Sequence, residues 1–239
     1  MLKNTSIIFV IFSLLLLVQF TQQVPQEDRI FLVDQLGQNL LFRGNDPTKN
    51  GKFDYEGLVE IFKTKTQEQG LEFYKEFKLT VISVLQDSQI NVIEYDYFNN
   101  NSELGYYLNY PLTAEYFGYP GDYSKTQQQI IAQSYKSWTV DNLGQIAVMI
   151  RQQLEYENKE VPTIVYYHCA SGINLVHEPF GGYQMVIKGW TNKQIVDWYT
   201  EQNIPFPAQV YQNAVNWFCL YYSQENDIQD NDCLYQKLN

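Results

Sequence analysis

Positive charge is scarce in this chain of 239 residues, which has 16 lysines and arginines against 27 aspartates and glutamates and a net charge of −11. Its few arginines are Arg29, Arg43 and Arg151. Nucleic acids and anionic lipid headgroups are bound by clustered Lys and Arg, so this composition excludes both as partners. A site for a phosphorylated ligand would have to generate its own local positive potential.

Cysteine and histidine are also scarce, with three cysteines and two histidines in the chain. The spacing of His168, Cys169 and His177 matches no common zinc site, so no metal is expected. In an exported chain, three cysteines suggest one disulfide and one free thiol. Cys219 and Cys233 are close in sequence near the carboxy terminus and are the expected bridge. Cys169, alone after an apolar run, is then the free thiol.

Long apolar runs are limited to the amino terminus. After Lys3, the run 7–20 has the length of a signal-peptide core and falls short of the ~20 residues that a membrane-spanning helix needs. We expect residues 1–23 to be a signal peptide and 24–239 to form a single domain that is secreted or resides in the lumen of the secretory pathway. An uncleaved amino-terminal anchor, which would attach the domain to a membrane, is the alternative.

The rest of the chain alternates between apolar runs typical of strands and apolar residues at helical spacing, which favours one α/β domain. No internal repeat or long linker divides it. Strands are expected at 79–85, 91–98 and 162–168, short strands and turns over 30–50, and a loop over 99–122. Helices are expected from about residue 53 to 70, over 124–158, and at 178–189, 191–201 and 208–222.

Two polar residues in these segments have expected roles. Asn100-Asn101-Ser102 is an N-glycosylation sequon within the expected loop, so Asn100 is a candidate glycosylation site in an exported chain. Asp141 precedes an apolar helical stripe and is expected to cap that helix.

The segment with the most chemical information begins where the apolar run 162–168 ends. It reads His168-Cys169-Ala170-Ser171-Gly172-Ile173-Asn174-Leu175, a loop between an expected strand and an expected helix. In such a unit, loop amides and the helix dipole favour an anion above the amino terminus of the helix. A cysteine in the same cradle would be stabilised as a thiolate, the form that acts as a nucleophile. Gly172 would let the backbone bend closely around a ligand.

These residues resemble the signature His-Cys-x-x-Gly-x-x-Arg of the cysteine-dependent protein tyrosine and dual-specificity phosphatases. His168, Cys169 and Gly172 match it, whereas Leu175 stands where the signature has arginine, so the motif is Cys-x-x-Gly-x-x-Leu. The adjacent Val176 replaces the usual Ser or Thr.

The chain is similar in particular to an exported branch from single-celled eukaryotes, whose loop reads Cys-x-x-Gly-x-Asp-Arg-Thr-Gly-Glu. Asn174 and His177 are further departures from that version, and Glu178 matches it. The flanking segments 42–47, 138–142 and 216–221 also resemble this branch, so the similarity covers nearly the whole mature chain.

The resemblance implies an α/β fold with a central sheet flanked by helices, no cofactor, and a phosphate loop over 168–175 with Cys169 at the nucleophile position. It also implies a general acid on a loop before the signature, for which Asp122 is the candidate and a solvated turn residue the alternative. His168 is expected to be structural, and His177 to be exposed at the start of the helix.

Leu175 determines what activity to expect. In the family, the arginine donates two N–H groups to the phosphoryl oxygens and stabilises the charge on them, and leucine has no donor. Losing even one neutral oxyanion donor costs ~10²–10³ in rate, so a larger loss is expected. Nothing in the sequence places Arg29, Arg43 or Arg151 at the loop as a substitute.

Three functions remain open. The first is a catalytically impaired phosphatase-like protein that still binds a phosphorylated protein or a small anion. The second is an active but slow Cys169-dependent phosphatase in which another group replaces the arginine. The third is a secreted, Tyr-rich domain that binds sugars or proteins, suggested by the 20 tyrosines. A thiol hydrolase is not favoured, because the adjacent His168 and Cys169 side chains would point apart.

Overall fold

The computed structural model describes residues 25–113, 118–138, 141–156, 161–229 and 231–235. The expected signal peptide, residues 1–23, lies outside the described residues, as does part of the 138–142 segment. In the part of the chain that is described, no helix combines the length and the apolar character needed to cross a bilayer.

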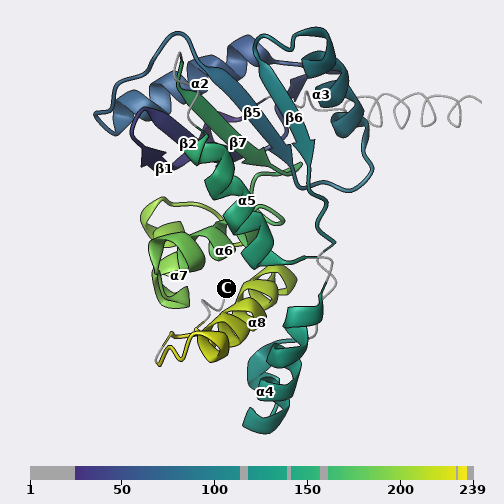
Figure 1. The fold of residues 1–239 in the computed structure, drawn as a ribbon, viewed down its shortest axis with the longest axis vertical. Coiled ribbons are helices and arrows are strands. Elements are labelled where there is room, and N and C mark those ends of the chain that lie inside the picture. Colours follow the sequence, from purple (N-terminus) through teal and green to yellow (C-terminus); the bar gives the residue numbers. More distant parts are fainter. Residues whose placement is uncertain (1–24, 114–117, 139–140, 157–160, 230, 236–239) are drawn as a thin grey trace, which may run out of the picture.

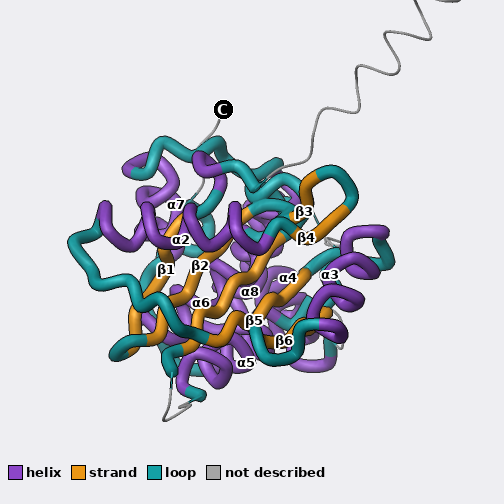
Figure 2. The backbone as a smooth tube through the Cα atoms, turned by 90° about the horizontal axis from the view of Figure 1, so that it is seen from above, coloured by secondary structure: helices purple, strands orange, loops and turns teal. Residues whose placement is uncertain are grey.

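A five-stranded sheet in the order β1-β2-β7-β5-β6 forms the centre of the fold (Figures 1 and 2). Its strands are β1 (Phe31–Leu36), β2 (Asn39–Gly44), β5 (Lys78–Ser83), β6 (Gly105–Asn109) and β7 (Thr163–His168). β1 pairs antiparallel with β2, and the other pairs are parallel. Gly44 and Ser83 are both in register with His168, so β2, β5 and β7 end at one carboxyl edge.

Helices cover both faces of this sheet (Figure 1). One face carries α2 (Tyr55–Glu68) and α3 (Gln89–Asn100), and the other α5 (Leu143–Glu155), α6 (His177–Lys188), α7 (Asn192–Glu201) and α8 (Gln209–Glu225), with α4 (Lys125–Ser134) against α8. The remaining elements are the hairpin β3 (Thr48–Lys49) and β4 (Lys52–Phe53) and the short turns η1 (Glu27–Arg29), η2 (Pro120–Asp122) and η3 (Tyr135–Ser137). The expected α/β class, with a central sheet flanked by helices, is confirmed.

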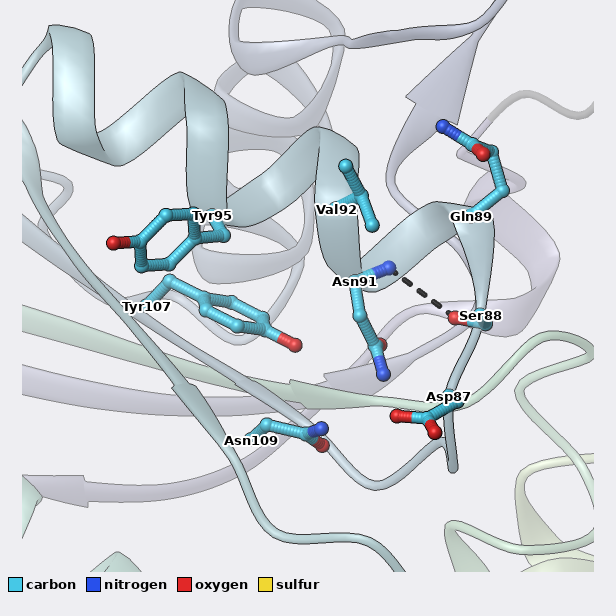
Figure 3. Close-up of a pocket in the computed structure, with 8 residues that line it drawn as sticks. All are labelled: Asp87, Ser88, Gln89, Asn91, Val92, Tyr95, Tyr107 and Asn109. Carbon is cyan, nitrogen blue, oxygen red and sulfur yellow. Dashed lines mark hydrogen bonds between the residues drawn. The ribbon is translucent and has the colours of Figure 1, made fainter.

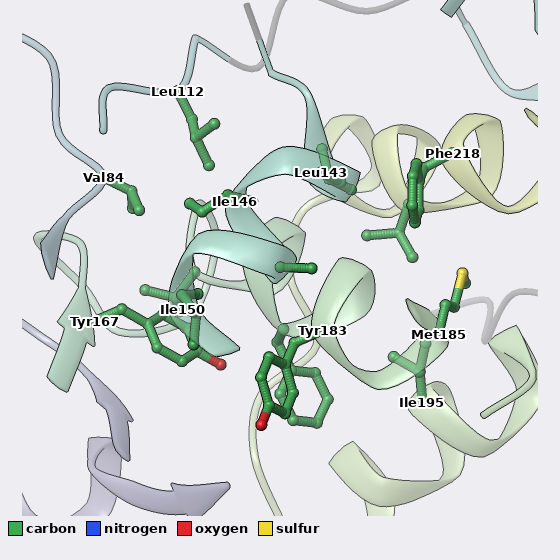
Figure 4. Packing of buried hydrophobic residues seen from close by; sticks show 14 of the residues in the cluster. Val84, Leu112, Leu143, Ile146, Ile150, Tyr167, Tyr183, Met185, Ile195 and Phe218 are labelled. Atoms are coloured by element: carbon green, nitrogen blue, oxygen red, sulfur yellow. The ribbon is translucent and has the colours of Figure 1, made fainter. Parts of the chain in front are cut away.

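The two faces of the sheet pack two apolar cores. All six residues of β7 are buried, as expected for a central strand of a parallel sheet covered on both sides. On the α2 side, Phe42 stacks on Phe62 with ring centroids 4.4 Å apart. On the other side, Tyr167 of β7 packs among Ile146 and Ile150 of α5 (Figure 4). The strand that precedes the signature loop is therefore held rigidly from both faces.

The segment 91–98 is a helix, and the strand expected there is wrong. Ser88 caps α3 by accepting a hydrogen bond from the Asn91 amide at 3.2 Å. Glu94 and Phe98, one turn apart, are the buried residues of α3. The β-branched and aromatic composition of this segment favours a strand, but its apolar residues pack at helical spacing.

Two further expectations are corrected between residues 99 and 158. The loop expected over 99–122 contains β6, and the helix expected over 124–158 is divided into α4, η3 and α5. Asn142, and not Asp141, caps α5 by accepting from the Gln145 amide at 3.1 Å. Asp141 instead accepts the Thr113 amide at 2.6 Å, which ties the segment after β6 to the start of α5.

Cys219 of α8 and Cys233 form a disulfide, the pairing expected from the sequence, and Cys169 is free. The bridge fixes the end of the chain to α8. Asn192 of α7 holds the same segment through its side-chain amide, which donates to the carbonyl of Tyr235 at 2.9 Å.

We predict that Cys233→Ser lowers the free energy of unfolding by about 2–3 kcal/mol, because a bridge across a sequence separation of 14 restricts the unfolded chain. Urea denaturation followed by tryptophan fluorescence measures the change. A reducing agent should produce the same loss in the wild type and no further loss in the variant. Equal stability of the wild type with and without reductant would contradict the prediction.

Candidate functional site

The signature loop, residues 169–176, lies between the end of β7 and the start of α6 at the carboxyl edge of the sheet. Two backbone hydrogen bonds attach it to the end of β2: the Cys169 amide donates to the Gly44 carbonyl, and the Asp46 amide to the Ala170 carbonyl, each at 3.3 Å. The expected position of the loop, between a strand and a helix, is confirmed.

Several amides of the signature loop have no acceptor among the described residues. Within the residues that the structure describes, the following loop N–H groups donate to no protein acceptor: Ala170, Ser171, Gly172, Asn174, Leu175 and Val176. They lie next to the amino terminus of the twelve-residue helix α6, where the helix dipole also favours negative charge. The loop therefore retains the donors from which an anion cradle is built.

Gly172 is required by the path of the loop. Its φ is +69°, in the left-handed region that favours glycine. A Cβ at this position would lie 2.8 Å from the backbone nitrogen of Asn45, so the loop could not approach the end of β2 as closely with any other residue.

Cys169 and His168 face opposite sides of the sheet. Cys169 is 3% exposed, packs with the core on the α5–α8 side, and has its Sγ 3.9 Å from the Ser171 hydroxyl. His168 is fully buried and lies against α3 and Tyr166, whose ring stacks on it at 5.5 Å. This arrangement brings no imidazole of His168 to the thiol, as a cysteine hydrolase would need.

His168 pairs with Glu94 of α3, and both side chains are fully buried with Nε2 and Oε1 2.7 Å apart. Burial raises the pKa of Glu94 above its usual value. Burial alone would lower the pKa of His168, but the facing Glu94 carboxylate outweighs it, so the pKa of His168 is raised. The pair fixes the residue before Cys169 and agrees with a structural role for His168.

Arg43 lies directly beneath the loop, which the sequence did not indicate. It is fully buried at the end of β2, and its Nη2 donates to the Gly172 carbonyl at 3.1 Å. Its Nη1 donates to the hydroxyl of Tyr199. The guanidinium also lies 5.0 Å from the ring centroids of Phe180 and Tyr199, at cation–π distance. The structure thus places one arginine, Arg43, at the loop, although nothing in the sequence indicated it.

His177 is 3% exposed, and the expectation of an exposed histidine is wrong. Its Nδ1 is 3.0 Å from the Tyr199 hydroxyl, and its ring packs edge-on against Tyr199. Burial, with a contribution from Arg43, lowers the pKa of His177 to about 3, so this side chain is neutral near pH 7.

Leu175 is half-buried and packs against the core on the α5–α8 side. Beside it, the Asn174 side chain accepts the Ala208 amide at 2.9 Å, which links the loop to the residues before α8. Apolar contact thus replaces the polar contacts that an arginine would make at this position.

Asp122, the candidate general acid, lies in the exposed turn η2. Neighbouring residues pack this turn against α8, where the Trp217 ring contacts Tyr123 and its Nε1 donates to the Gly118 carbonyl at 2.9 Å. Among the described residues, Asp122 forms no hydrogen bond or ion pair with the loop. Its role as an acid stays a prediction.

Exposed tyrosines are dispersed over the described surface. Tyr95 lies on α3, Tyr106 on β6, Tyr156 at the end of α5 and Tyr235 near the chain end. A cavity of about 580 Å³ between α3 and β6 takes only Tyr95 from this set (Figure 3), while Tyr106 and Tyr156 line a second cavity of about 420 Å³. The four tyrosines thus do not share one site, which counts against one aromatic recognition surface.

Other predicted features fall in described parts of the chain. Asn100 is exposed at the end of α3, and glycosylation there stays a prediction. Within the described residues, no group of three His, Cys, Asp or Glu side chains is arranged to hold a metal ion.

Two residues of the site were not identified from the sequence. Arg43 is one of three arginines and directly follows an apolar run, a signal that could have indicated a buried cation. Glu94 lies in the segment mistaken for a strand, and only the helical spacing of Glu94 and Phe98 could have placed it on the sheet.

We predict that Glu94→Gln lowers the free energy of unfolding at pH 6 by about 1–3 kcal/mol, because the buried His168 loses its partner. The pKa of His168 is raised, so this stabilisation is complete below its ordinary value of 6.5 and is lost as the pH rises through the folded value. The difference between the two proteins should therefore shrink toward pH 9. Urea denaturation at several pH values measures it, with the exposed Glu103→Gln as control, and a constant difference would contradict the assignment.

No family model matches the chain. No curated protein matches it.

Among solved structures, the chain is similar to the Yvh1 phosphatase domain from Chaetomium thermophilum, with a TM-score of 0.40 and 11% identity, covering 79% of this chain and 95% of that one. It is also similar to human DUSP28, with a TM-score of 0.39 and 12% identity over 86% of this chain and 99% of that one. A third is the human tyrosine phosphatase-like serine/threonine/tyrosine-interacting protein, with a TM-score of 0.38 and 13% identity over 80% and 97% of the two chains.

Two of these neighbours are, by name, a phosphatase domain and a tyrosine phosphatase-like protein. The site of this chain consists of a strand, a loop with amides that are free among the described residues, and a helix, with a buried arginine beneath the loop.

Proposed function

We propose that this chain is an exported protein of the dual-specificity and tyrosine phosphatase superfamily whose loop binds a phosphorylated ligand or a small anion while hydrolysis is lost or nearly lost. The observation that carries the proposal is Leu175 at the position of the phosphate-binding arginine, in a loop that keeps the cysteine and the glycine of the signature. Cys169 follows the central strand, Gly172 makes the turn, and six of the loop amides donate to no acceptor among the described residues.

The chemistry separates binding from turnover. Backbone amides and a helix dipole stabilise a bound anion without further help. Hydrolysis in addition requires donors on the oxygens of the phosphoryl group during transfer, where a bidentate guanidinium acts most strongly. Leu175 has no such donor, and its side chain packs toward the core.

Export is supported by features of the sequence and the fold. The apolar run 7–20 is typical of a signal peptide, and the Cys219–Cys233 disulfide suits an oxidising compartment. Asn100 is exposed, as glycosylation would require.

An active but slow phosphatase is the second candidate, and Arg43 favours it. Arg43 is the described arginine that contacts the loop, through the Gly172 carbonyl. However, Arg43 is 0% exposed and its terminal nitrogens each donate to a protein group, Nη1 to Tyr199 and Nη2 to Gly172, so the guanidinium is held beneath the loop and not presented as a fork to a phosphoryl group.

We predict that the wild type hydrolyses 4-nitrophenyl phosphate at or near the background rate, and that Leu175→Arg raises the rate by at least ~10²-fold. This substrate is chosen because its leaving group departs without protonation, so an absent general acid does not hide the gain. Steady-state release of 4-nitrophenol measures the rate.

Leu175→Lys is the matched control, since it restores the charge without the planar fork and should gain less. Adding Cys169→Ser to Leu175→Arg should abolish the gain. Wild-type turnover as fast as that of Leu175→Arg, and lost in Cys169→Ser, would show instead a working enzyme with a substitute for the arginine.

A further inference from the structure

Arg43 is a buried cation without a carboxylate partner. The residue is 0% exposed, and among the described residues it forms no ion pair. Its Nη1 and Nη2 donate to the Tyr199 hydroxyl and the Gly172 carbonyl, while its Nε is buried without an acceptor. A buried charge that no anion balances is costly, so the position of Arg43 calls for a compensating negative charge nearby.

The aromatic rings around Arg43 meet only part of this requirement. Phe180, Trp198 and Tyr199 have ring centroids between 5.0 and 5.6 Å from the guanidinium carbon. Cation–π contacts stabilise the cation through the ring quadrupoles, but they bring no net negative charge. The rings keep the guanidinium out of water and leave its charge uncompensated.

The titratable groups that face Arg43 carry no negative charge near pH 7. Burial raises the pKa of Tyr166, Tyr167 and Tyr199, so their hydroxyls stay protonated. Burial and Arg43 keep His177 neutral. The local anion is therefore not one of these side chains.

The acidic side chains near the loop interact with groups other than Arg43. Glu94 faces His168 on the opposite side of the sheet. Asp46 accepts the Thr48 amide at 2.7 Å, and burial raises the pKa of its carboxyl. Glu178 is buried at the start of α6, and its charge adds to the burial that raises the pKa of Tyr135 and Tyr211. Among the described residues it forms no ion pair with Arg43.

The loop is where a compensating anion can lie. Arg43 is bonded to the carbonyl of Gly172, the middle residue of the loop, and among the described residues the amides of Ser171 and Gly172 donate to no protein acceptor. Cys169 is on the same side of the sheet, and both Cys169 and Arg43 act electrostatically on Tyr199, which lies near both. Arg43, Cys169 and the loop thus lie on one side of the sheet around Tyr199.

We propose that Arg43 is the cation of this loop: from beneath the sheet edge it compensates the Cys169 thiolate and a small tetrahedral oxyanion held on the loop amides, in place of the arginine missing at position 175. This inference rests on the proposed function, because it supplies the positive charge for the anion binding assigned there. Arg43 is a positioning and charge-compensating residue. Its positive charge raises the electrostatic potential at the loop, and its hydrogen bond to Gly172 fixes the shape of the loop. It donates no hydrogen bond to the phosphoryl oxygens.

The test compares wild type, Arg43→Gln and Arg43→Lys, with Arg151→Gln as a control that removes the same charge from an arginine paired with Glu155 on α5. Inorganic phosphate is titrated calorimetrically against each protein at pH 7 and fixed ionic strength. Thiolate absorbance at 240 nm is followed against pH with Cys169→Ser as the blank. Because the other two cysteines form the disulfide, this signal reports Cys169 alone.

Arg43→Gln should weaken phosphate binding by about tenfold or more and move the appearance of thiolate to higher pH by about one unit, whereas Arg151→Gln should change neither. Arg43→Lys keeps the charge, so its thiolate curve should stay near that of wild type. Its phosphate binding should fall several-fold, because one ammonium cannot hold Gly172 and Tyr199 as the fork does.

The outcomes separate the two proposals. If the wild type binds phosphate and Arg43→Gln binds it equally with an unchanged thiolate curve, the role of Arg43 is overturned and the proposed function stands. If Arg43→Gln does not fold, Arg43→Met serves as the neutral variant, and phosphate binding equal to that of the wild type overturns the role of Arg43. If neither the wild type nor Leu175→Arg binds phosphate, the proposed anion binding itself is overturned.

Discussion

The signature loop depends on one buried contact, between the Arg43 guanidinium and the Gly172 carbonyl. Gly172 can approach β2 only because it has no Cβ, and Arg43 can remain buried only because Phe180, Trp198 and Tyr199 surround it. These rings come from α6 and α7, so the contact joins the loop, the sheet and two helices. The shape of the loop is thus fixed by its underside, and the residue at position 175 is not needed to form it.

A second buried pair fixes the loop from the other face of the sheet. His168 and Glu94 are fully buried, and their ionisation is coupled because the carboxylate favours the charged imidazole while burial disfavours both charges. The strand between them and Arg43, β7, is buried along its whole length. The ionisable groups near the loop are therefore buried. Salt screens their charges much less than it screens the charges on the surface of this acidic protein.

The sequence predicted the elements whose hydrophobic pattern agrees with their final packing. β7 is a continuous apolar run, and α6, α7 and α8 have apolar residues at helical spacing. The prediction failed for 91–98, where Ile, Val, Tyr and Phe favour a strand and only the tertiary contacts of Glu94 and Phe98 make the helix stable. It also missed β6, a short edge strand within a segment rich in tyrosine and asparagine.

For the site, the loop itself could be predicted and its support could not. Cys169, Gly172 and the loop amides are contiguous in sequence, so a local pattern identifies them. Arg43 and Glu94 reach the loop through the order of strands in the sheet and the placement of α3, which no local pattern encodes. His177 shows the same limit, because its burial depends on the ring of Tyr199 from a different helix.

The structure also explains how binding and hydrolysis can be separated in one loop. A bound oxyanion is stabilised by nearby positive potential and by amides, and the field of a cation acts at a distance in a buried, poorly screened site. Hydrolysis requires more, namely donors placed on the oxygens whose charge changes during transfer. In the proposal, Arg43 meets the first condition and not the second, because it is fully buried and held beneath the loop by Gly172 and Tyr199. Replacing a clamp at position 175 by Leu175 would therefore remove turnover while leaving the fold and the electrostatic basis of anion binding in place.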